Sequence, residues 1–131
     1  MQDLAILDRF YGAICMGDLD TAVACLTPNA RIWNNGIGMA LSVDQIRPGW
    51  EQMIAATKER GVADIQRYAT AQGCVQQHVF FTRDQAGARH GLACCLVVRI
   101  KEGLIDRLEE YCDIKSTFPL AEGAPVERRG K

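Results

Sequence analysis

The sequence predicts an α+β fold, in which helices pack on one face of an antiparallel sheet. Two observations predict it: helical spacing of apolar residues is confined to residues 4–60, and residues 63–113 contain four strand-like stretches joined by short turns. A run of helices followed by a run of strands is typical of the α+β class. The 131 residues, of which 48% are hydrophobic and 24% charged, suffice for one domain with one core.

The first two helices are predicted near the N-terminus. Apolar side chains recur at helical spacing from Leu4 to Ile14, and Gly17 is suited to the left-handed conformation that ends a helix. A shorter helix should begin with Asp18 or Asp20 as its cap and stop at the Thr-Pro-Asn of residues 27–29.

A short strand over residues 30–34 and a loop should lead into the third helix. Ser42 and Gln45 have the spacing of a capping box, so we expect a helix from there to about Arg60. Pro48 lies inside this segment and should kink the helix or mark its true first turn. Gly61 should close it.

The second half of the chain is predicted to form an antiparallel meander. Strands are expected over residues 63–71, 74–83, 90–101 and 104–113, with turns at residues 84–87 and 102–103. The chain after Ser116 contains Pro and Gly and should be extended. We therefore expect one domain over residues 1–115 and an extended C-terminal tail over residues 116–131.

Composition excludes several classes of function. Fifteen basic and sixteen acidic residues give a net charge of -1 without a basic stripe, which argues against nucleic-acid binding. The apolar runs are too short to cross a bilayer, and residues 1–3 lack the positive charge that opens a signal peptide. We therefore expect a cytoplasmic protein that binds neither nucleic acid nor membrane.

The six cysteines predict neither disulfides nor a metal site. They lie at positions 15, 25, 74, 94, 95 and 112 in apolar stretches, and no CxxC pair occurs. Cys94 and Cys95 should point to opposite faces of a strand, so they cannot bind one ion together. In a reducing compartment such thiols behave as small hydrophobic residues.

Glu110 is the strongest candidate for a catalytic group. Alternation along residues 104–113 puts Glu110 on the same face as Leu108 and Cys112, whereas Ile105 should lie on the opposite face. A carboxylate that points into an apolar interior must be paired, hydrogen-bonded or protonated. Such a group is a candidate general acid or base; alternatively, it is a structural carboxylate satisfied by hydrogen bonds or by an arginine.

The strand predicted over residues 90–101 indicates that both faces of the sheet are covered. Residues 92–98 (Leu-Ala-Cys-Cys-Leu-Val-Val) are apolar on both faces, whereas a sheet with one solvated face would alternate. We expect a second copy of the chain to pack on the outer sheet face as an isologous homodimer. The alternative is that the C-terminal tail covers this face.

The order helix, helix, strand, helix and four strands resembles the nuclear transport factor 2-like superfamily, and in particular its SnoaL-like branch, related to ketosteroid isomerase and limonene-epoxide hydrolase. Three segments carry the resemblance, which spans residues 3–115: ARIWNN at 30–35, GCVQQH at 73–78 and GLIDRLEEYCD at 103–113. The resemblance implies a cone-shaped α+β barrel, with three N-terminal helices packed on a curved antiparallel or mixed sheet. The open mouth of the cone is then a largely apolar pocket for a small molecule.

The resemblance to the epoxide hydrolases suggests three site residues. Trp33 and Asn35 fall where those enzymes hold the attacking water, and Glu110 falls at their catalytic aspartate. The arginine and second aspartate that complete the hydrolase site have no counterpart in register at residues 77–81. This departure puts hydrolase chemistry of that kind in doubt.

The resemblance to ketosteroid isomerase is also incomplete. Tyr11 falls at the helix position of the isomerase tyrosine, but the catalytic base maps near Asn34, which cannot take a proton. The isomerase's oxyanion-hole aspartate maps into the apolar residues 96–98. Loss of both carboxylates argues against isomerisation by that particular mechanism.

His78 is the second catalytic candidate, because histidine titrates near neutral pH and can form an acid–base pair with Glu110. Alternation leaves open whether His78 faces the pocket together with Phe80 or lies on the other face as an ordinary sheet histidine. His90 begins a strand and is expected to be exposed.

The remaining pocket candidates are apolar walls and hydrogen-bonding groups: Tyr11, Asn35, Trp33, Trp50 and Phe80. The tryptophans can equally be ordinary core residues. Arg31 should lie on the face of Trp33, where it can contact a substrate or pair with Glu110. Pairing would make Glu110 part of a structural salt bridge.

The sequence thus favours a small cofactor-independent enzyme of the SnoaL-like kind. It would act by general acid–base proton transfer on an apolar small molecule, as an isomerase, dehydratase, cyclase or hydrolase. Glu110 would be the acid or base, His78 and Asn35 would assist, and no metal or other cofactor would be needed. Two alternatives are a non-catalytic ligand-binding or dimerisation module and an enzyme like limonene-epoxide hydrolase.

Overall fold

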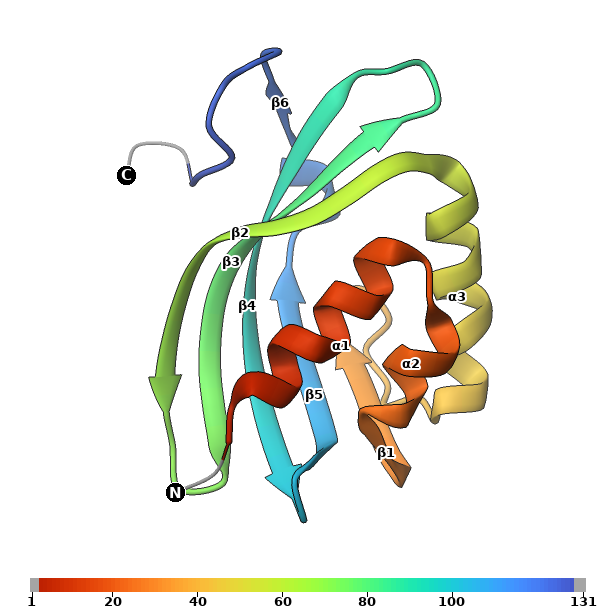
Figure 1. Cartoon of the computed structure of the whole chain (residues 1–131), viewed down its shortest axis with the longest axis vertical. Coiled ribbons are helices and arrows are strands. Elements are labelled where there is room, and N and C mark those ends of the chain that lie inside the picture. Colours follow the sequence, from red (N-terminus) through yellow and green to blue (C-terminus); the bar gives the residue numbers. More distant parts are fainter. Residues whose placement is uncertain (1–2, 129–131) are drawn as a thin grey trace.

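Three helices pack on one face of a six-stranded mixed sheet, which confirms the predicted α+β class (Figure 1). The computed structural model describes residues 3–128; the outermost ends of the predicted domain and tail, residues 1–2 and 129–131, lie outside them. The helices are α1 (Ala5–Met16), α2 (Leu19–Ala24) and α3 (Val43–Ala56). The strands are β1 (Leu26–Asn34), β2 (Thr57–Ala69), β3 (Gly73–Asp84), β4 (Arg89–Lys101), β5 (Leu104–Cys112) and β6 (Phe118–Leu120).

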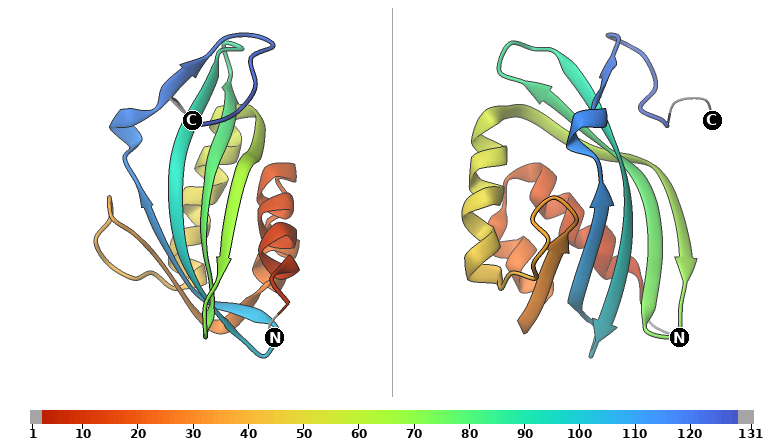
Figure 2. Two further views of the ribbon diagram at one scale, coloured as in Figure 1. Left: turned by 90° about the vertical axis from the view of Figure 1, so that its left-hand side faces the viewer. Right: turned by 180° about the vertical axis from the view of Figure 1, so that it is seen from behind.

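The sheet has the strand order β1-β5-β4-β3-β2, and β6 pairs with β4 beyond the end of β5. Strand β1 runs parallel to β5, whereas strands β2 to β5 form the predicted antiparallel meander. The sheet curves around the helices, and all three helices lie on its concave side (Figure 2). This arrangement is the cone expected from the resemblance.

Local sequence signals fix several helix ends as predicted. Gly17 ends α1 in the left-handed conformation, with φ of 75°. Ser42 and Gln45 form the predicted capping box, each side chain accepting a hydrogen bond from the backbone N–H of the other. Pro48 lies within α3, which begins at Val43 rather than at the proline.

Two predicted boundaries are wrong, because strand pairing replaces the helix. Helix α3 ends at Ala56 instead of near Arg60, because the chain turns extended at Thr57 and pairs with the end of β3. Strand β1 begins at Leu26, so residues 27–29 lie within a strand instead of stopping a helix. Pro28 is tolerated there because β1 is an edge strand with an irregular register at this point.

The face predicted for Ile105 is also wrong. Arg107 pairs with Arg99, but Ile105 pairs with Ile100, so the register shifts between these two pairs. The shift turns Ile105 into the core, where its side chain is fully buried. Leu108 and Glu110 follow the irregularity and keep the inward orientation predicted for them.

The described part of the C-terminal tail folds back onto the outer face of the sheet. Phe118 packs against Gly91, so close that a Cβ atom on Gly91 would lie 2.6 Å from the Phe118 ring. Farther along, the Arg128 side chain donates hydrogen bonds to Asp64 and Gln77. The tail therefore covers part of the outer face, as the alternative to dimerisation required, but only over β2, β3 and the start of β4.

Removal of the Phe118 ring should destabilise the protein. Phe118 is only 7% exposed, so we expect Phe118→Ala to lower the free energy of unfolding by about 3 kcal/mol, the usual cost of deleting a buried aromatic ring. Ile114, four residues earlier and 73% exposed, is the matched control; Ile114→Ala should change stability by about 0.5 kcal/mol or less. Denaturant unfolding measures both, and equal losses would contradict tail docking.

Candidate functional site

A cavity of about 450 Å³ lies between the helices and the concave face of the sheet. Its walls are mainly apolar. Helices α1 and α3 contribute Phe10 and Trp50, whereas β3 and β4 contribute Phe80 and Leu92. Trp50 and Phe80 therefore take the lining positions predicted for them. A cavity of this size and character is typical of small-molecule sites.

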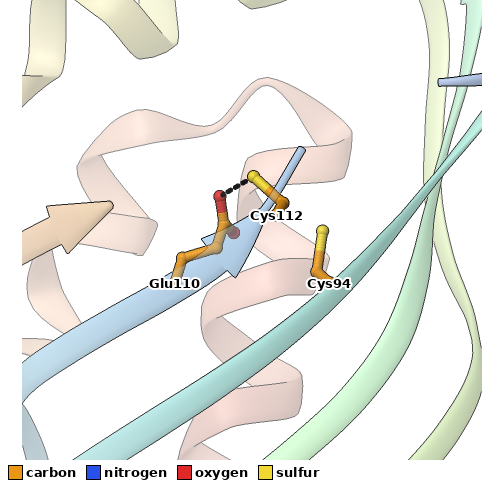
Figure 3. Close-up of side chains that lie close together, drawn as sticks. All are labelled: Cys94, Glu110 and Cys112. Atoms are coloured by element: carbon orange, nitrogen blue, oxygen red, sulfur yellow. Dashed lines mark hydrogen bonds between the residues drawn. The ribbon is translucent and has the colours of Figure 1, made fainter. Parts of the chain in front are cut away.

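Glu110 lies in the wall of this cavity, as predicted from strand alternation. The thiol of Cys112 is 3.5 Å from Glu110 Oε1, and Figure 3 shows the two side chains on the same side of the sheet as Cys94. Among residues 3–128, no Lys, Arg or His forms an ion pair with Glu110. Burial therefore raises the pKa of Glu110 above its ordinary value, and the hydrogen bond from Cys112 offsets this rise only in part.

Tyr11 reaches the cavity from α1 and is 8% exposed. Its ring packs edge-on against Phe10 and His78, with centroid distances of 5.1 and 5.0 Å. Burial, and secondarily the negative charge of Glu110, raise the pKa of Tyr11 well above its ordinary value. Tyr11 therefore remains a protonated hydrogen-bond donor throughout the physiological range.

His78 does not line the cavity, although it lies on the helix-covered face of β3. Arg67 donates to Gln76 Oε1 at 2.7 Å, which leaves the Gln76 amide to donate to His78 Nδ1 at 2.9 Å. The proton of neutral His78 is therefore on Nε2, which is buried without a hydrogen-bond partner in the described chain. Burial, and then the charge of Arg67, lower the pKa of His78 to about 4.

This environment argues against His78 as a proton shuttle and favours a structural role beneath Tyr11. The inward face of β3 carries Gln76 and His78, which lie under the helices. Val79 and Phe81 are on the outer face and are also buried, so both faces of β3 are covered there.

Strand β1 is turned one residue away from the predicted orientation. Its parallel register pairs Asn34 with Glu110 and Trp33 with Glu109, so Asn34 shares the inward face and Trp33 the outward one. The Trp33 ring packs on Tyr111 at 5.1 Å, and Trp33 also contributes to the lining of the cavity, as predicted. Asn34, which was not among the predicted site residues, also lines the cavity.

Arg31 and Asn35 share the outward orientation, and neither lines the cavity. Arg31 is exposed and donates to the carbonyl oxygens of Asn29 and Ala30, so it does not neutralise Glu110. Asn35 is exposed, and its side-chain oxygen accepts a hydrogen bond from the Cys112 backbone N–H at 3.1 Å. Its role is to tie the end of β1 to β5.

His90 is a lining residue that sequence reasoning missed. Its side chain is 36% exposed, in line with the exposure expected at the start of a strand, but it also lines the cavity, and its Nε2 is 2.9 Å from Asp84 Oδ2. The signal was available in the alternation of β4, because His90, Leu92 and Cys94 share one face.

The side chains of Cys94, Glu110 and Cys112 are the best metal-ligand candidates of the described residues, with ligand atoms within 4.8 Å of one another. Two thiolates and a carboxylate are a donor set that suits zinc. Burial is the main cause that raises the pKa of Cys112 to about 11 and the pKa of Cys94 still further. Both thiols therefore resist the deprotonation that metal binding requires.

The curved sheet and the three covering helices enclose an apolar cavity with one acidic group, which defines an α+β cone fold. The chain belongs to the SnoaL-like domain family, whose family model matches residues 7–108. No curated protein matches the sequence. Within residues 3–128, the helices are too short and polar to span a membrane.

Solved structures share the fold at low sequence identity. The Δ5-3-ketosteroid isomerase from Mycobacterium sp. has a TM-score of 0.76 and 13% identity, covering 88% of this chain and 96% of that one. An LEH-like epoxide hydrolase from M. tuberculosis has a TM-score of 0.70 and 18% identity, covering 86% and 83%. A protein provisionally called a polyketide cyclase, from Pseudomonas putida KT2440, has a TM-score of 0.73 and 19% identity, covering 88% and 94%.

The raised pKa of Glu110 predicts a pH-dependent cost to stability. In the unfolded chain Glu110 ionises near pH 4, so the folded state loses stability as pH rises from there toward its own higher pKa. Glu110→Gln cannot ionise and should gain stability relative to wild type between pH 4 and pH 8, measured by denaturant unfolding.

Glu109→Gln provides the matched control for this measurement. Glu109 is the neighbouring residue on the outward face, where Arg107 donates to its carboxylate at 2.7 Å. Its replacement should give no such gain at high pH. A stability difference between Glu110→Gln and wild type that is the same at both pH values would contradict the buried, unpaired state of Glu110.

Proposed function

We propose that this protein is a small enzyme that transfers protons on an apolar small molecule bound in the cavity, with Glu110 as the general acid or base. The proposal rests chiefly on one observation: Glu110 reaches a 450 Å³ apolar cavity without a cation to neutralise it. A carboxyl group with a raised pKa is suited to exchange protons near neutral pH. Isomerase, dehydratase and cyclase reactions all fit this chemistry.

The residues around Glu110 support a simple mechanism. The ionised carboxylate takes a proton from a C–H or O–H group of the bound molecule and returns it at a second position. Tyr11, protonated and in the same cavity, can donate a hydrogen bond to the oxygen on which negative charge develops. The apolar walls exclude water, which strengthens both interactions.

The alternative of a non-catalytic binding or dimerisation module requires Glu110 to be neutralised by Arg31 or packed without free space. Arg31 lies on the outward face and bonds to backbone carbonyl oxygens, and free space adjoins Glu110. The outward position of Arg31 and the free space beside Glu110 both favour an enzyme over a non-catalytic module.

An enzyme like limonene-epoxide hydrolase requires an arginine and a second carboxylate beside Glu110. Within residues 3–128 the side chains beside the Glu110 carboxyl group include two thiols, Cys94 and Cys112, and no ion pair reaches it. Asn35, the residue expected to hold the attacking water, is exposed and binds the backbone of Cys112. The geometry therefore supports proton transfer better than epoxide hydrolysis.

We also propose that the protein forms a homodimer through the outer face of the sheet and that it is cytoplasmic. The tail covers only part of that face, and it leaves Val97 and Tyr111 42% and 45% exposed. Between β4 and β5, Val97 pairs with Glu109 and Tyr111 pairs with Cys95. Trp33 packs on Tyr111, so these residues together form a mainly apolar patch. A patch of this kind is typical of an interface between copies of a chain.

Loss of the acidic group should abolish turnover. A substrate can be found by thermal shift against a panel of hydrophobic metabolites. With it, Glu110→Gln should lower kcat by about 100-fold or more, the usual contribution of a positioned acid or base, whereas Glu109→Gln should retain wild-type kcat. Full turnover by a folded Glu110→Gln variant would rule out the proposed role.

A charge on the outer face should separate the proposed dimer. Val97→Glu places a carboxylate at the centre of the patch, where burial between two copies is costly. Light scattering after size exclusion should give a dimer mass for wild type and a monomer mass for the variant. Lys101→Glu, on an exposed residue at the far end of β4, should leave the dimer intact. A wild-type monomer at all protein concentrations tested would refute the proposal.

A further inference from the structure

The cavity has a second polar group that the proposed function does not use. His90 lines the cavity from the start of β4, and Thr82 lies directly opposite it on β3. Ile114 and Thr117, both exposed, contribute to the same lining. His90 therefore stands toward the open side of the cavity, separated along β4 from the Glu110 end by Leu92.

Asp84 fixes the orientation of the His90 ring and selects the ring nitrogen that faces the carboxylate. The Nε2 atom of His90 is 2.9 Å from Asp84 Oδ2, and Asp84 Oδ1 accepts a second hydrogen bond from the Ala88 backbone N–H. The hydrogen bond to His90, followed by the bond from Ala88, lowers the pKa of Asp84, which keeps it ionised. In neutral His90 the proton is thus on Nε2, facing the carboxylate.

The other ring nitrogen of His90, Nδ1, is left as an acceptor. Within residues 3–128 it has no hydrogen-bond partner. An oriented imidazole with a free acceptor nitrogen, backed by a carboxylate, is suited to receive a hydrogen bond from a hydroxyl group.

His90 and Glu110 lie toward different ends of the cavity. His90 and Cys94 share one face of β4 and are four residues apart, or about 13 Å at the usual rise of a strand. A ligand atom of Glu110 lies within 4.8 Å of the Cys94 sulfur. The strand register places Glu110 opposite Leu96, still farther along β4, so only an extended molecule can contact both polar groups.

The side chains between these ends are apolar and partly aromatic. Leu92 lies between His90 and Cys94 on the inward face, and Phe80, its partner on β3, lines the same wall. Trp50 lines the cavity from α3. This middle section suits a flat hydrocarbon frame and offers it little hydrogen bonding.

We propose that His90, oriented by Asp84, is a substrate-binding residue that accepts a hydrogen bond from a hydroxyl or enol group at the outer end of the substrate. The substrate is then a flat, extended apolar molecule with one oxygen at His90 and its reacting end at Glu110. The binding role of His90 stands by itself; only the assignment of the reacting end rests on the proposed function.

Three naphthalene probes of matched shape test this proposal. Naphthalene-2,6-diol has a hydroxyl at each end, 2-naphthol has one, and 6-methoxy-2-naphthol replaces the second hydroxyl proton with a methyl group. Fluorescence titration of the full-length protein should show that the diol binds about tenfold more tightly than either of the others, as one additional well-oriented hydrogen bond allows. Equal affinity of the three probes for wild type would overturn the proposal.

Variants then assign the effect to His90. His90→Phe keeps a ring but removes the acceptor, so the advantage of the diol should fall to the statistical factor that two equivalent hydroxyls give. Asp84→Asn should reduce the advantage, and Asp20→Asn, at a solvent-exposed ion pair with Arg47, should preserve it. Retention of the full advantage in His90→Phe, with folding verified by its melting temperature, would also overturn the proposal.

A Glu110→Gln variant separates this inference from the proposed function. If it weakens all three probes and leaves the advantage of the diol intact, both ends of the cavity act as described. If the diol still binds more tightly than the other two probes but Glu110→Gln turns over a substrate at the wild-type rate, the proposed role of Glu110 is wrong and the binding role of His90 is supported.

Discussion

The site depends on one register: the position of β5 between β1 and β4. Glu110 on β5 faces Leu96 on β4 and Asn34 on β1, and this alignment directs its carboxyl group into the apolar cavity. The shift at Ile105 lets the start of β5 fill the core while the later residues keep their inward alternation. A one-residue slip in the register of β5 would turn Glu110 outward and put Glu109, which pairs with Arg107 on the outward face, in its inward position.

The polar groups inside the cone differ in how many hydrogen bonds they make. Hydrogen bonds link Asp8 on the surface through Arg67 and Gln76 to His78, and the buried Gln76 and His78 side chains form a rigid support on which the Tyr11 ring packs. Glu110 has only a thiol donor, and its carboxyl group keeps a free surface toward the cavity. The hydrogen-bonded chain is suited to a structural role, and the carboxyl group of Glu110, which has only a thiol donor, is suited to chemistry.

Much of the fold was predictable from the sequence because its signals are local. The left-handed Gly17, the capping box at Ser42 and the tight turn at Glu102-Gly103 each depend on residues close in the chain. The inward direction of Glu110 followed from alternation within one strand. The boundary errors at α3 and β1 arose where pairing with a distant strand overrode a local preference, which single-sequence patterns cannot show.

The site was predicted less completely, because it depends on how strands align. Asn34 and Asn35 are neighbours with similar turn propensity, and only the parallel register with β5 selects Asn34 for the cavity. His90 was missed because the cavity that it lines is formed together with distant segments of the chain, including Thr117. The partial covering of the outer face by Phe118 could not be read from a tail with few periodic residues.

The parallel pairing of β1 with β5 has a consequence for biogenesis. Asn34 and Glu110 are neighbours in the sheet, yet most of the chain separates them. During synthesis the N-terminal helices and β1 emerge long before β5, so the exposed side of β1 must wait for its partner strand. Contacts of such long range are slow to form, because the entropy of closing the intervening loop is lost before the strands pair. The acidic niche is therefore among the last parts of the molecule to be assembled, and a nascent chain that stops short of β5 has a partial core and no site.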